Sequence, residues 1–207
     1  MRNWKPFRQL NHGRPCQPRR WKLLAQIKGF GLAFPPMSTV WQQIEVRGIV
    51  EIPELPGVHV EALPIFQDPR GTLHELFRVD EVPAGFKPLM ACSSWSHAGV
   101  TRGPHQHVGQ DDYFTFAGPS NFTVYLWDDR PGSAKAAKGW FILTGEQAPS
   151  RIHVPRGVVH AYRNTGNVMG LVVTTTSLLF KGEGRRDPVD EIRHELNPAS
   201  PYQLPSS

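Results

Sequence analysis

Two histidines one residue apart, followed by two consecutive aspartates, are the feature that most constrains this chain. The stretch Gly99–Gly118 contains His105, His107 and Asp111 in this order. Successive side chains of a β-strand point to opposite faces, so one regular strand through these residues would place all three on one face. Imidazoles and a carboxylate that share a face can bind a metal ion or move a proton.

Short segments of alternating or β-branched apolar residues recur along the chain, separated by turn residues. Asn121–Trp127 alternates and predicts a half-buried strand, whereas Trp140–Gly145 and Gly170–Phe180 are apolar and rich in β-branched residues. Strands at such short intervals predict an all-β barrel or jelly roll. Apart from the N-terminal leader, helical character is confined to a short peripheral segment, Asp190–Leu196.

Charge divides the chain into an extension and a folded part. Residues 1–36 contain eight Lys/Arg and no Asp/Glu, whereas residues 37–207 contain fifteen Lys/Arg and eighteen Asp/Glu, a net charge of −3. We favour Met37 as the real start, with the first 36 residues arising from upstream translation. Because the folded part is mildly acidic, nucleic acid is not an expected partner. The expected divisions are a basic, flexible extension over 1–42, one domain over 43–197 and a loose tail over 198–207.

The remaining composition favours a cytoplasmic protein with no membrane partner. The two cysteines, Cys16 and Cys92, offer no disulfide framework, which fits a reducing compartment. No apolar run approaches the length of a membrane span, because Leu23–Phe34 is interrupted by Lys28 and two glycines.

A second histidine-bearing stretch, Val154–Asn164, joins the first in resembling the two motifs of the cupin superfamily. Cupins usually have Glu where Asp111 stands and a glycine where Pro149 stands. The resemblance implies an all-β fold, the cupin double-stranded β-helix or jelly roll with a short peripheral helix, but it leaves the chemistry open. The positions with cupin spacing are Gly99, His105, His107, Asp111 and Gly118, followed by Pro155, Gly157, His160 and Asn164.

Five pieces of the chain resemble, in order, the dTDP-4-dehydrorhamnose 3,5-epimerase family of cupins. This resemblance implies a homodimer that acts on a nucleotide-linked 4-keto-6-deoxy sugar in dTDP-rhamnose and polysaccharide biosynthesis. It also implies proton abstraction next to the ketone without a cofactor. The pieces are FQDPRGTLHELF at Phe66–Phe77, VTRGPHQH at Val100–His107, VYLWDDRPGS at Val124–Ser133, VPRGVVHAY at Val154–Tyr162 and RDPVDEI at Arg186–Ile192.

The same resemblance assigns roles to individual residues. His105 corresponds to the base, and Asp187 to the aspartate that orients it. A neutral imidazole is a good base near pH 7, and a carboxylate on its second nitrogen fixes the tautomer. Arg70 and Arg102 correspond to arginines that hold the diphosphate, since guanidinium groups suit phosphate oxygens. The remaining substrate-binding candidates are His160, in the pocket wall, and Glu75, a potential ion-pair partner of Arg70.

Three positions depart from the epimerase pattern. His107 stands where the family usually has Gln, and Asp112 stands near the position of a lysine that stabilises the enolate oxygen. The segment Thr174–Phe180 lacks the family's tyrosine acid, for which Tyr113, Tyr125 and Tyr162 are potential substitutes. These departures place full double epimerisation in question.

Two other functions therefore stay open. The first is a metal-dependent cupin, an isomerase or dioxygenase of another small molecule, because three imidazoles and a carboxylate suit Zn, Fe, Mn or Ni. The second is a sugar-binding cupin without turnover. The metal ligands of the first alternative would be His105, His107, Asp111 and His160.

Overall fold

The computed structural model describes residues 39–205 of the 207-residue chain. The basic extension expected over residues 1–42 lies outside this range except for its last four residues, and the interpretation of Met37 as the start lies outside it entirely. Within the described range, no helix is long and apolar enough to cross a membrane.

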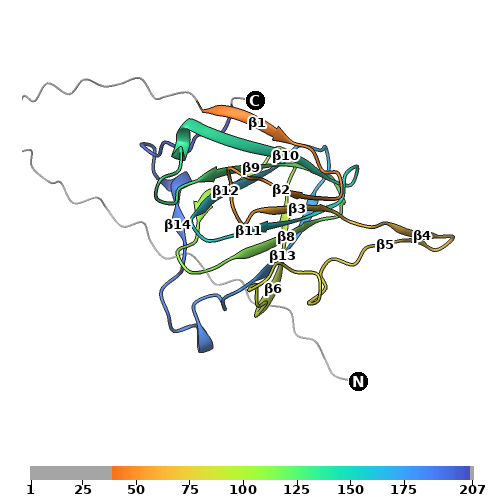
Figure 1. The fold of residues 1–207 in the computed structure, drawn as a ribbon. Coiled ribbons are helices and arrows are strands. Elements are labelled where there is room, and N and C mark those ends of the chain that lie inside the picture. The colour runs from red at the N-terminus through yellow and green to blue at the C-terminus, as the bar shows by residue number, and fades with distance from the viewer. Residues whose placement is uncertain (1–38, 206–207) are drawn as a thin grey trace, which may run out of the picture. The chain divides into compact units, whose positions relative to one another are not determined.

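Two six-stranded sheets form a jelly roll, which confirms the predicted all-β cupin fold (Figure 1). One sheet has the order β1 (Val40–Ile44), β10 (Lys138–Gly145), β9 (Asn121–Asp128), β12 (Val158–Asn164), β7 (Thr101–Gln106) and β14 (Ile192–Arg193). The other has the order β2 (Ile49–Glu51), β3 (His59–Ala62), β11 (Ser150–Val154), β8 (Asp112–Phe116), β13 (Gly170–Thr176) and β6 (Met90–Ser96). Neighbouring strands are antiparallel, except that β1 runs parallel to β10.

The core fills the space between the two sheets. In β9, Phe122, Val124 and Leu126 point inward and belong to a buried cluster that also contains Phe116 and Ile142. Alternation along the strand explains why these three residues share the inner face. Burial of such large apolar side chains is the main favourable contribution to folding.

The outer face of β9 is also buried, which differs from the half-buried strand that its sequence predicts. Tyr125 and Trp127 form a second cluster with Tyr202 from the C-terminal segment. Tyr202 is 4% exposed, and its hydroxyl donates a hydrogen bond to Asp129. The segment expected to be a loose tail is therefore packed on the sheet at Tyr202, because an aromatic ring there covers apolar side chains of β9.

The segment expected to be a short peripheral helix is divided between a short strand and a 3-10 turn. Ile192 and Arg193 form β14 and pair with Gln106 and His105 of β7. Only a single 3-10 turn, η3 (His194–Leu196), follows. Pairing with the free edge of β7 satisfies backbone groups that a helix would otherwise have to satisfy internally. The other 3-10 turns in the described residues are η1 (Lys135–Ala137) and η2 (Glu183–Arg185).

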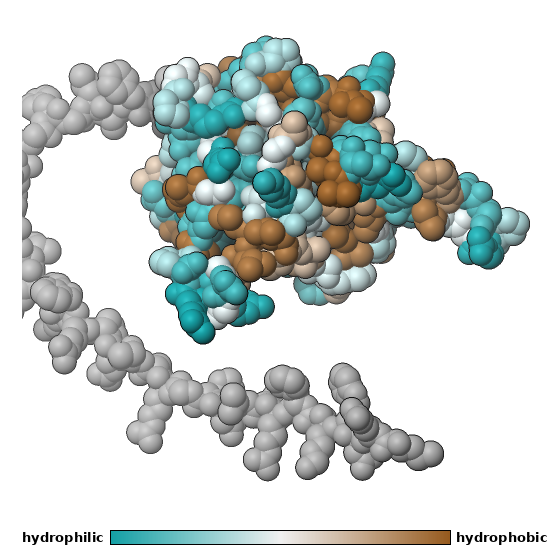
Figure 2. Space-filling view, turned by 60° about the horizontal axis from the view of Figure 1, so that its bottom comes forward, coloured by the Kyte–Doolittle hydropathy of each residue, from teal (hydrophilic) through white to brown (hydrophobic). Residues whose placement is uncertain are grey.

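A small hairpin projects from the body of the jelly roll (Figure 1). It consists of β4 (Phe66–Asp68) and β5 (Gly71–Leu73), joined by the predicted turn around Arg70. Phe66 and Leu73 are 51% and 59% exposed. In Figure 2 the projection carries apolar residues beside a polar tip.

Candidate active site

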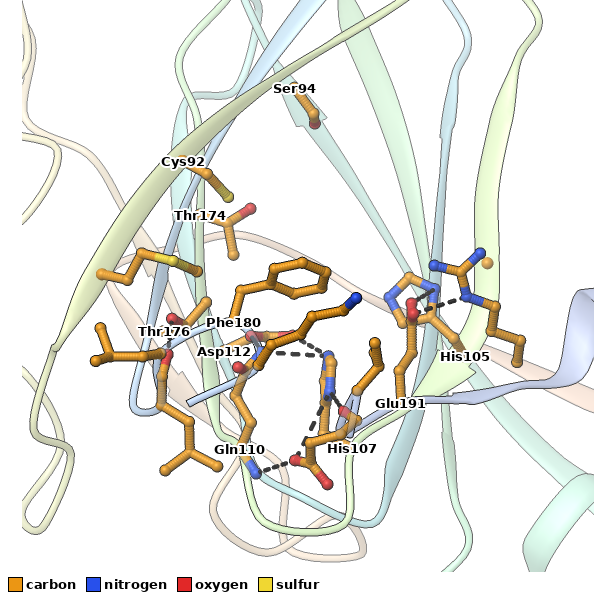
Figure 3. Close-up of a pocket in the computed structure, with 18 of the residues that line it drawn as sticks. Cys92, Ser94, His105, His107, Gln110, Asp112, Thr174, Thr176, Phe180 and Glu191 are labelled. Atoms are coloured by element: carbon orange, nitrogen blue, oxygen red, sulfur yellow. Dashed lines mark hydrogen bonds and ion pairs between the residues drawn. The ribbon is translucent and has the colours of Figure 1, made fainter. Parts of the chain in front are cut away.

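A cavity of about 950 Å³ is lined by strands of both sheets (Figure 3). Its walls come from β7 and β12 of one sheet, from β6, β8 and β13 of the other, and from the segment 178–195. Apolar residues such as Phe114 and Phe180 line it together with charged residues. This combination is typical of sites that bind small molecules.

The three sequence-predicted histidines form one cluster, with His105 and His107 on the cavity wall. His105 of β7 and His160 of β12 are directly paired across the two strands, and their ring centroids are 4.4 Å apart. The His107 ring lies 5.8 Å from each of the other two rings. One nitrogen of each imidazole lies within 4.8 Å of the others. The two histidine-bearing stretches are thus brought together by strand pairing.

The carboxylate beside this cluster is Asp112, whereas the sequence pattern favoured Asp111. The Asp112 Oδ2 atom lies 3.2 Å from His107 Nε2 and 3.4 Å from His160 Nε2. Asp111 instead accepts the backbone N–H of Arg156 at 2.9 Å. The reason is that β7 ends at Gln106 and β8 begins at Asp112, so the intervening residues are not a strand and period-two alternation does not continue.

His107 is held between Asp112 and the backbone of Asp190. Its Nδ1 atom hydrogen-bonds with the carbonyl oxygen of Asp190, and its Nε2 atom faces Asp112. Burial disfavours the charged imidazole, but the hydrogen bond and charge of Asp112, with support from Asp190, raise the pKa of His107. A buried carboxylate thus stabilises the charged form of this histidine.

His160 is the most enclosed of the three. It is 2% exposed, and it lies behind the cavity surface in place of the expected pocket wall. Its Nδ1 atom bonds with the Val158 carbonyl, and its Nε2 atom has no hydrogen-bond partner among the described residues. Burial and the neighbouring His105 lower the pKa of His160 to about 3, despite the attraction of Asp112. We conclude that His160 is neutral at physiological pH.

His105 faces the cavity as a neutral imidazole. Burial lowers its pKa to about 3, with smaller contributions from His107 and Arg193. The nearest carboxylate is Glu191, whose Oε1 atom lies 3.7 Å from His105 Nδ1. Glu191 is shared with Arg193, which donates to Oε2 at 2.7 Å, so its charge is partly neutralised.

Asp187, expected to orient His105, lies elsewhere on the cavity wall. Its backbone N–H donates to the Lys181 carbonyl at 2.8 Å, and its carboxylate is packed against Gly182. No contact between Asp187 and His105 is found in residues 39–205. Glu191 belongs to the same sequence piece, RDPVDEI, which could have pointed to it.

Arg102 lines the cavity, as its sequence position suggested. Its Nε atom donates to Ser96 Oγ, and its Nη2 atom donates to the Trp95 carbonyl, both at 3.0 Å. These two bonds fix the guanidinium group at the cavity edge. An arginine held in this way is suited to an anionic ligand.

Arg70 and Glu75 are not in the cavity wall of their own chain. Arg70 is at the turn of the projecting hairpin, where its side chain is 90% exposed and bonds with Asp68. Glu75 forms an ion pair with Arg78 at 3.6 Å in place of the suggested pair with Arg70. The turn projects Arg70 away from the strands that line the cavity, whereas Glu75 follows the hairpin.

No protein-family model matches the chain. The probable low-salt glycan biosynthesis epimerase Agl13 of Haloferax volcanii is 30% identical over 141 residues, which cover 68% of this chain and 88% of that protein. The spore coat polysaccharide biosynthesis protein SpsL of Bacillus subtilis is 30% identical over 140 residues, which cover 65% of this chain and 90% of that protein.

Solved structures share the fold. NovW, a 4-keto-6-deoxy sugar epimerase of Streptomyces spheroides, superposes with a TM-score of 0.62 at 21% identity, covering 78% of this chain and 82% of NovW. The rmlC epimerase of Mycobacterium tuberculosis gives a TM-score of 0.62 at 20% identity, covering 76% and 78% of the two chains. Together with the 30% identity to an epimerase over most of its length, this likeness identifies the chain as a member of the dTDP-4-dehydrorhamnose 3,5-epimerase-like family of cupins.

Proposed function

We propose that this protein is an epimerase or isomerase of a nucleotide-linked 4-keto-6-deoxy sugar. The observation that carries the proposal is a neutral imidazole, His105, that faces a cavity of about 950 Å³. Sites for small molecules have volumes of roughly 300–1,000 Å³. The names of both sequence relatives refer to glycan or polysaccharide biosynthesis, which supports a role in making a surface sugar such as rhamnose.

In this proposal, His105 takes a proton from the carbon next to the ketone. Burial keeps the imidazole unprotonated in the free protein, and the negative charge that develops on the bound substrate would raise its proton affinity as the proton moves. The imidazolium that forms would be stabilised by the Glu191 carboxylate, 3.7 Å from Nδ1. We therefore assign to Glu191 the orienting role that the sequence suggested for Asp187.

Arg102 is the proposed phosphate contact within the chain. Its guanidinium group is held by Ser96 and Trp95, so little side-chain entropy would be lost when a diphosphate binds. The apolar wall around Phe180 suits the base or the deoxy sugar.

A second copy of the chain supplies Arg70 in this proposal. The β4–β5 hairpin exposes Phe66 and Leu73 and carries Arg70 at its turn, away from its own cavity. Exposed apolar residues on a projecting element fit burial against a partner. A symmetric homodimer would bury both hairpins at once and could bring each Arg70 to the other chain's cavity.

The second candidate function is that of a metal-dependent cupin that binds a divalent cation. The geometry of the histidine cluster favours such a site. His107 and His160 each use Nδ1 for a backbone carbonyl, so both Nε2 atoms face Asp112. The orphaned Nε2 atom of buried His160 fits a metal ligand. The residues that would hold Zn, Fe, Mn or Ni are His105, His107 and His160. Asp112 lies beside His107 and His160 and would be the nearby carboxylate. The ion would supply polarisation of the ketone, but His105 could not then also act as the base.

The proposed substrate also suggests a place in the cell. We place the protein in the cytoplasm, a reducing compartment, where the thiol of Cys92 remains free. A sugar-binding cupin without turnover is the remaining alternative for the same cavity.

Hydrogen exchange tests the proposed function. Wild-type protein mixed with dTDP-4-keto-6-deoxyglucose in deuterated water should incorporate deuterium next to the ketone, followed by NMR. His105→Asn should slow this exchange roughly 100-fold or more. His107→Gln should largely spare it, because glutamine is the residue found there in the epimerases.

Metal content of the same samples separates the alternatives. If both variants lose exchange and metal together, the cluster is a metal site and His105 is a ligand. If dTDP raises the melting temperature but the wild-type protein shows no exchange, the protein binds the nucleotide sugar without turnover.

A further inference from the structure

Inversion at a carbon requires proton transfer on both of its faces. If His105 removes a proton from one face, the returning proton has to arrive from the other face. The epimerase resemblance places a tyrosine for this step in the segment Thr174–Phe180, which has none here. The donor has to be found elsewhere on the cavity wall.

The structure separates the four tyrosines of the chain, all of which lie in its described part. Tyr113 lines a small separate cavity of about 150 Å³ next to Arg151. Tyr125 and Tyr202 belong to the cluster on the outer face of β9. Tyr162 is the tyrosine whose side chain lines the main cavity.

Tyr162 reaches across the cavity from one sheet to the other. It follows His160 by two residues on β12, so the two side chains share the inner face of that strand. Its hydroxyl lies 2.7 Å from Ser94 Oγ on β6, a strand of the opposite sheet. In Figure 3, Ser94 and His105 lie at separate parts of the cavity wall. A sugar ring bound in the cavity between them would have the two groups on different sides.

We propose that Tyr162 is the acid that donates a proton to the reacting carbon from the side opposite His105, an inference that rests on the proposed epimerase function. The carbon–hydrogen bond breaks as His105 takes the proton, and its electron pair forms the enolate. The enolate carbon then takes the hydroxyl proton of Tyr162, which leaves a phenolate. Water accepts the proton of the imidazolium and returns one to the phenolate, so both groups regain their starting states.

The surroundings of Tyr162 suit this step. A phenol ordinarily titrates near pH 10, so the Tyr162 hydroxyl carries its proton at neutral pH and is available as a donor. The hydroxyl lies 2.7 Å from Ser94 Oγ, and the positive charge of Arg102 lines the same cavity, so both neighbours favour the phenolate. Both would stabilise the negative charge as it develops.

The test separates proton removal from inversion. Tyr162→Phe keeps the ring that packs against Phe114 and Phe116 and removes only the hydroxyl. In deuterated water this variant should still incorporate deuterium with retention of configuration, through His105. Its rate of forming the inverted sugar should fall roughly 100-fold or more.

Tyr125→Phe is the matched control. It removes a hydroxyl from the outer cluster and should change neither rate. Cys92→Ser tests the rival donor, because the Cys92 thiol also lines the cavity.

Four outcomes would overturn the inference, and they are distinguishable from one another. Unchanged inversion in Tyr162→Phe removes the hydroxyl from the mechanism. A parallel loss of exchange and inversion indicates a structural role. Loss of inversion alone in Cys92→Ser assigns the donor to the thiol. A wild-type protein without exchange overturns the proposed function, and the inference with it.

Discussion

At the scale of single residues, the pKa values of the three clustered histidines shift in different directions because their surroundings differ. His160 and His105 lose water without gaining a hydrogen bond to a carboxylate, so their pKa values fall. His107 is nearly as enclosed, but it gains Asp112 and the Asp190 carbonyl, so its pKa rises. Proximity to Asp112 alone does not decide the outcome, since His160 lies almost as close to it as His107 does.

The partner of His105 can be tested at this scale. Glu191→Gln removes the carboxylate 3.7 Å from Nδ1 but keeps the size of the side chain. We expect kcat to fall roughly tenfold or more, because the imidazolium loses its stabilising charge. Asp187→Asn is the matched control and should change kcat little, since Asp187 bonds within the segment around Lys181. A larger loss in Asp187→Asn than in Glu191→Gln would restore the assignment made from sequence. Steady-state kinetics of both variants provides the measurement.

At the scale of elements, two connections decide what the site contains. The irregular connection between β7 and β8 turns Asp111 toward Arg156 and brings Asp112 to the histidines. The β4–β5 hairpin carries Arg70 away from the strands that line the cavity of its own chain. Both effects come from segments where strand alternation ends, so neither follows from strand periodicity.

Mixing two inactive variants tests the role of the hairpin. Arg70→Ala and His105→Asn should each be impaired alone. If Arg70 completes the partner's cavity, a mixed dimer has one complete site. Random exchange of equal amounts should then restore about a quarter of wild-type activity, because half of the dimers are mixed and each has one working site of two. No recovery after denaturation and joint refolding would restrict Arg70 to its own chain. Arg47→Ala mixed with His105→Asn is a control, since Arg47 forms an ion pair with Glu45 at the surface.

At the scale of the whole molecule, the jelly roll encloses several histidines as neutral groups. His153 of β11 is 6% exposed, and burial lowers its pKa as it does for His105 and His160. These groups bind protons less readily in the folded chain than in the unfolded chain, whose histidines titrate near 6.5. Their contribution to stability is therefore complete above pH 6.5 and is lost as pH falls below that value.

We therefore expect the free energy of unfolding to decrease between pH 6.5 and pH 5. His107 acts in the opposite direction, because its raised pKa favours folding as the pH falls. The pKa values of four histidines are lowered and outnumber it, namely those of His105, His153, His160 and His194. His153→Gln should reduce the slope by up to about 1.4 kcal/mol per pH unit. Urea unfolding of both proteins across this range provides the measurement. An equal slope in the variant would show that His153 is not protonated on unfolding. His97→Gln is a control at an exposed position.

The sequence by itself determined the all-β fold and, through the resemblance to the two cupin motifs, indicated the two histidine stretches of the site. Alternating apolar residues and closely spaced turns permit few architectures, and the spacing of the two histidine stretches matches paired strands β7 and β12. It also pointed to His105 and Arg102 as cavity residues. These features are local or periodic, so they can be read along the chain.

Only the tertiary structure decided which other side chains lie beside the histidines and in the cavity wall. Asp112 replaced Asp111 because a strand ended, and Glu191 came to His105 because β14 pairs with the edge of β7. Tyr162 was distinguished from Tyr125 because one side chain faces the cavity and the other faces the outer cluster. Such choices depend on contacts between residues far apart in sequence, and on which side of a sheet a neighbouring segment covers. No local pattern specifies either of these, since both are set by the packing of the whole domain.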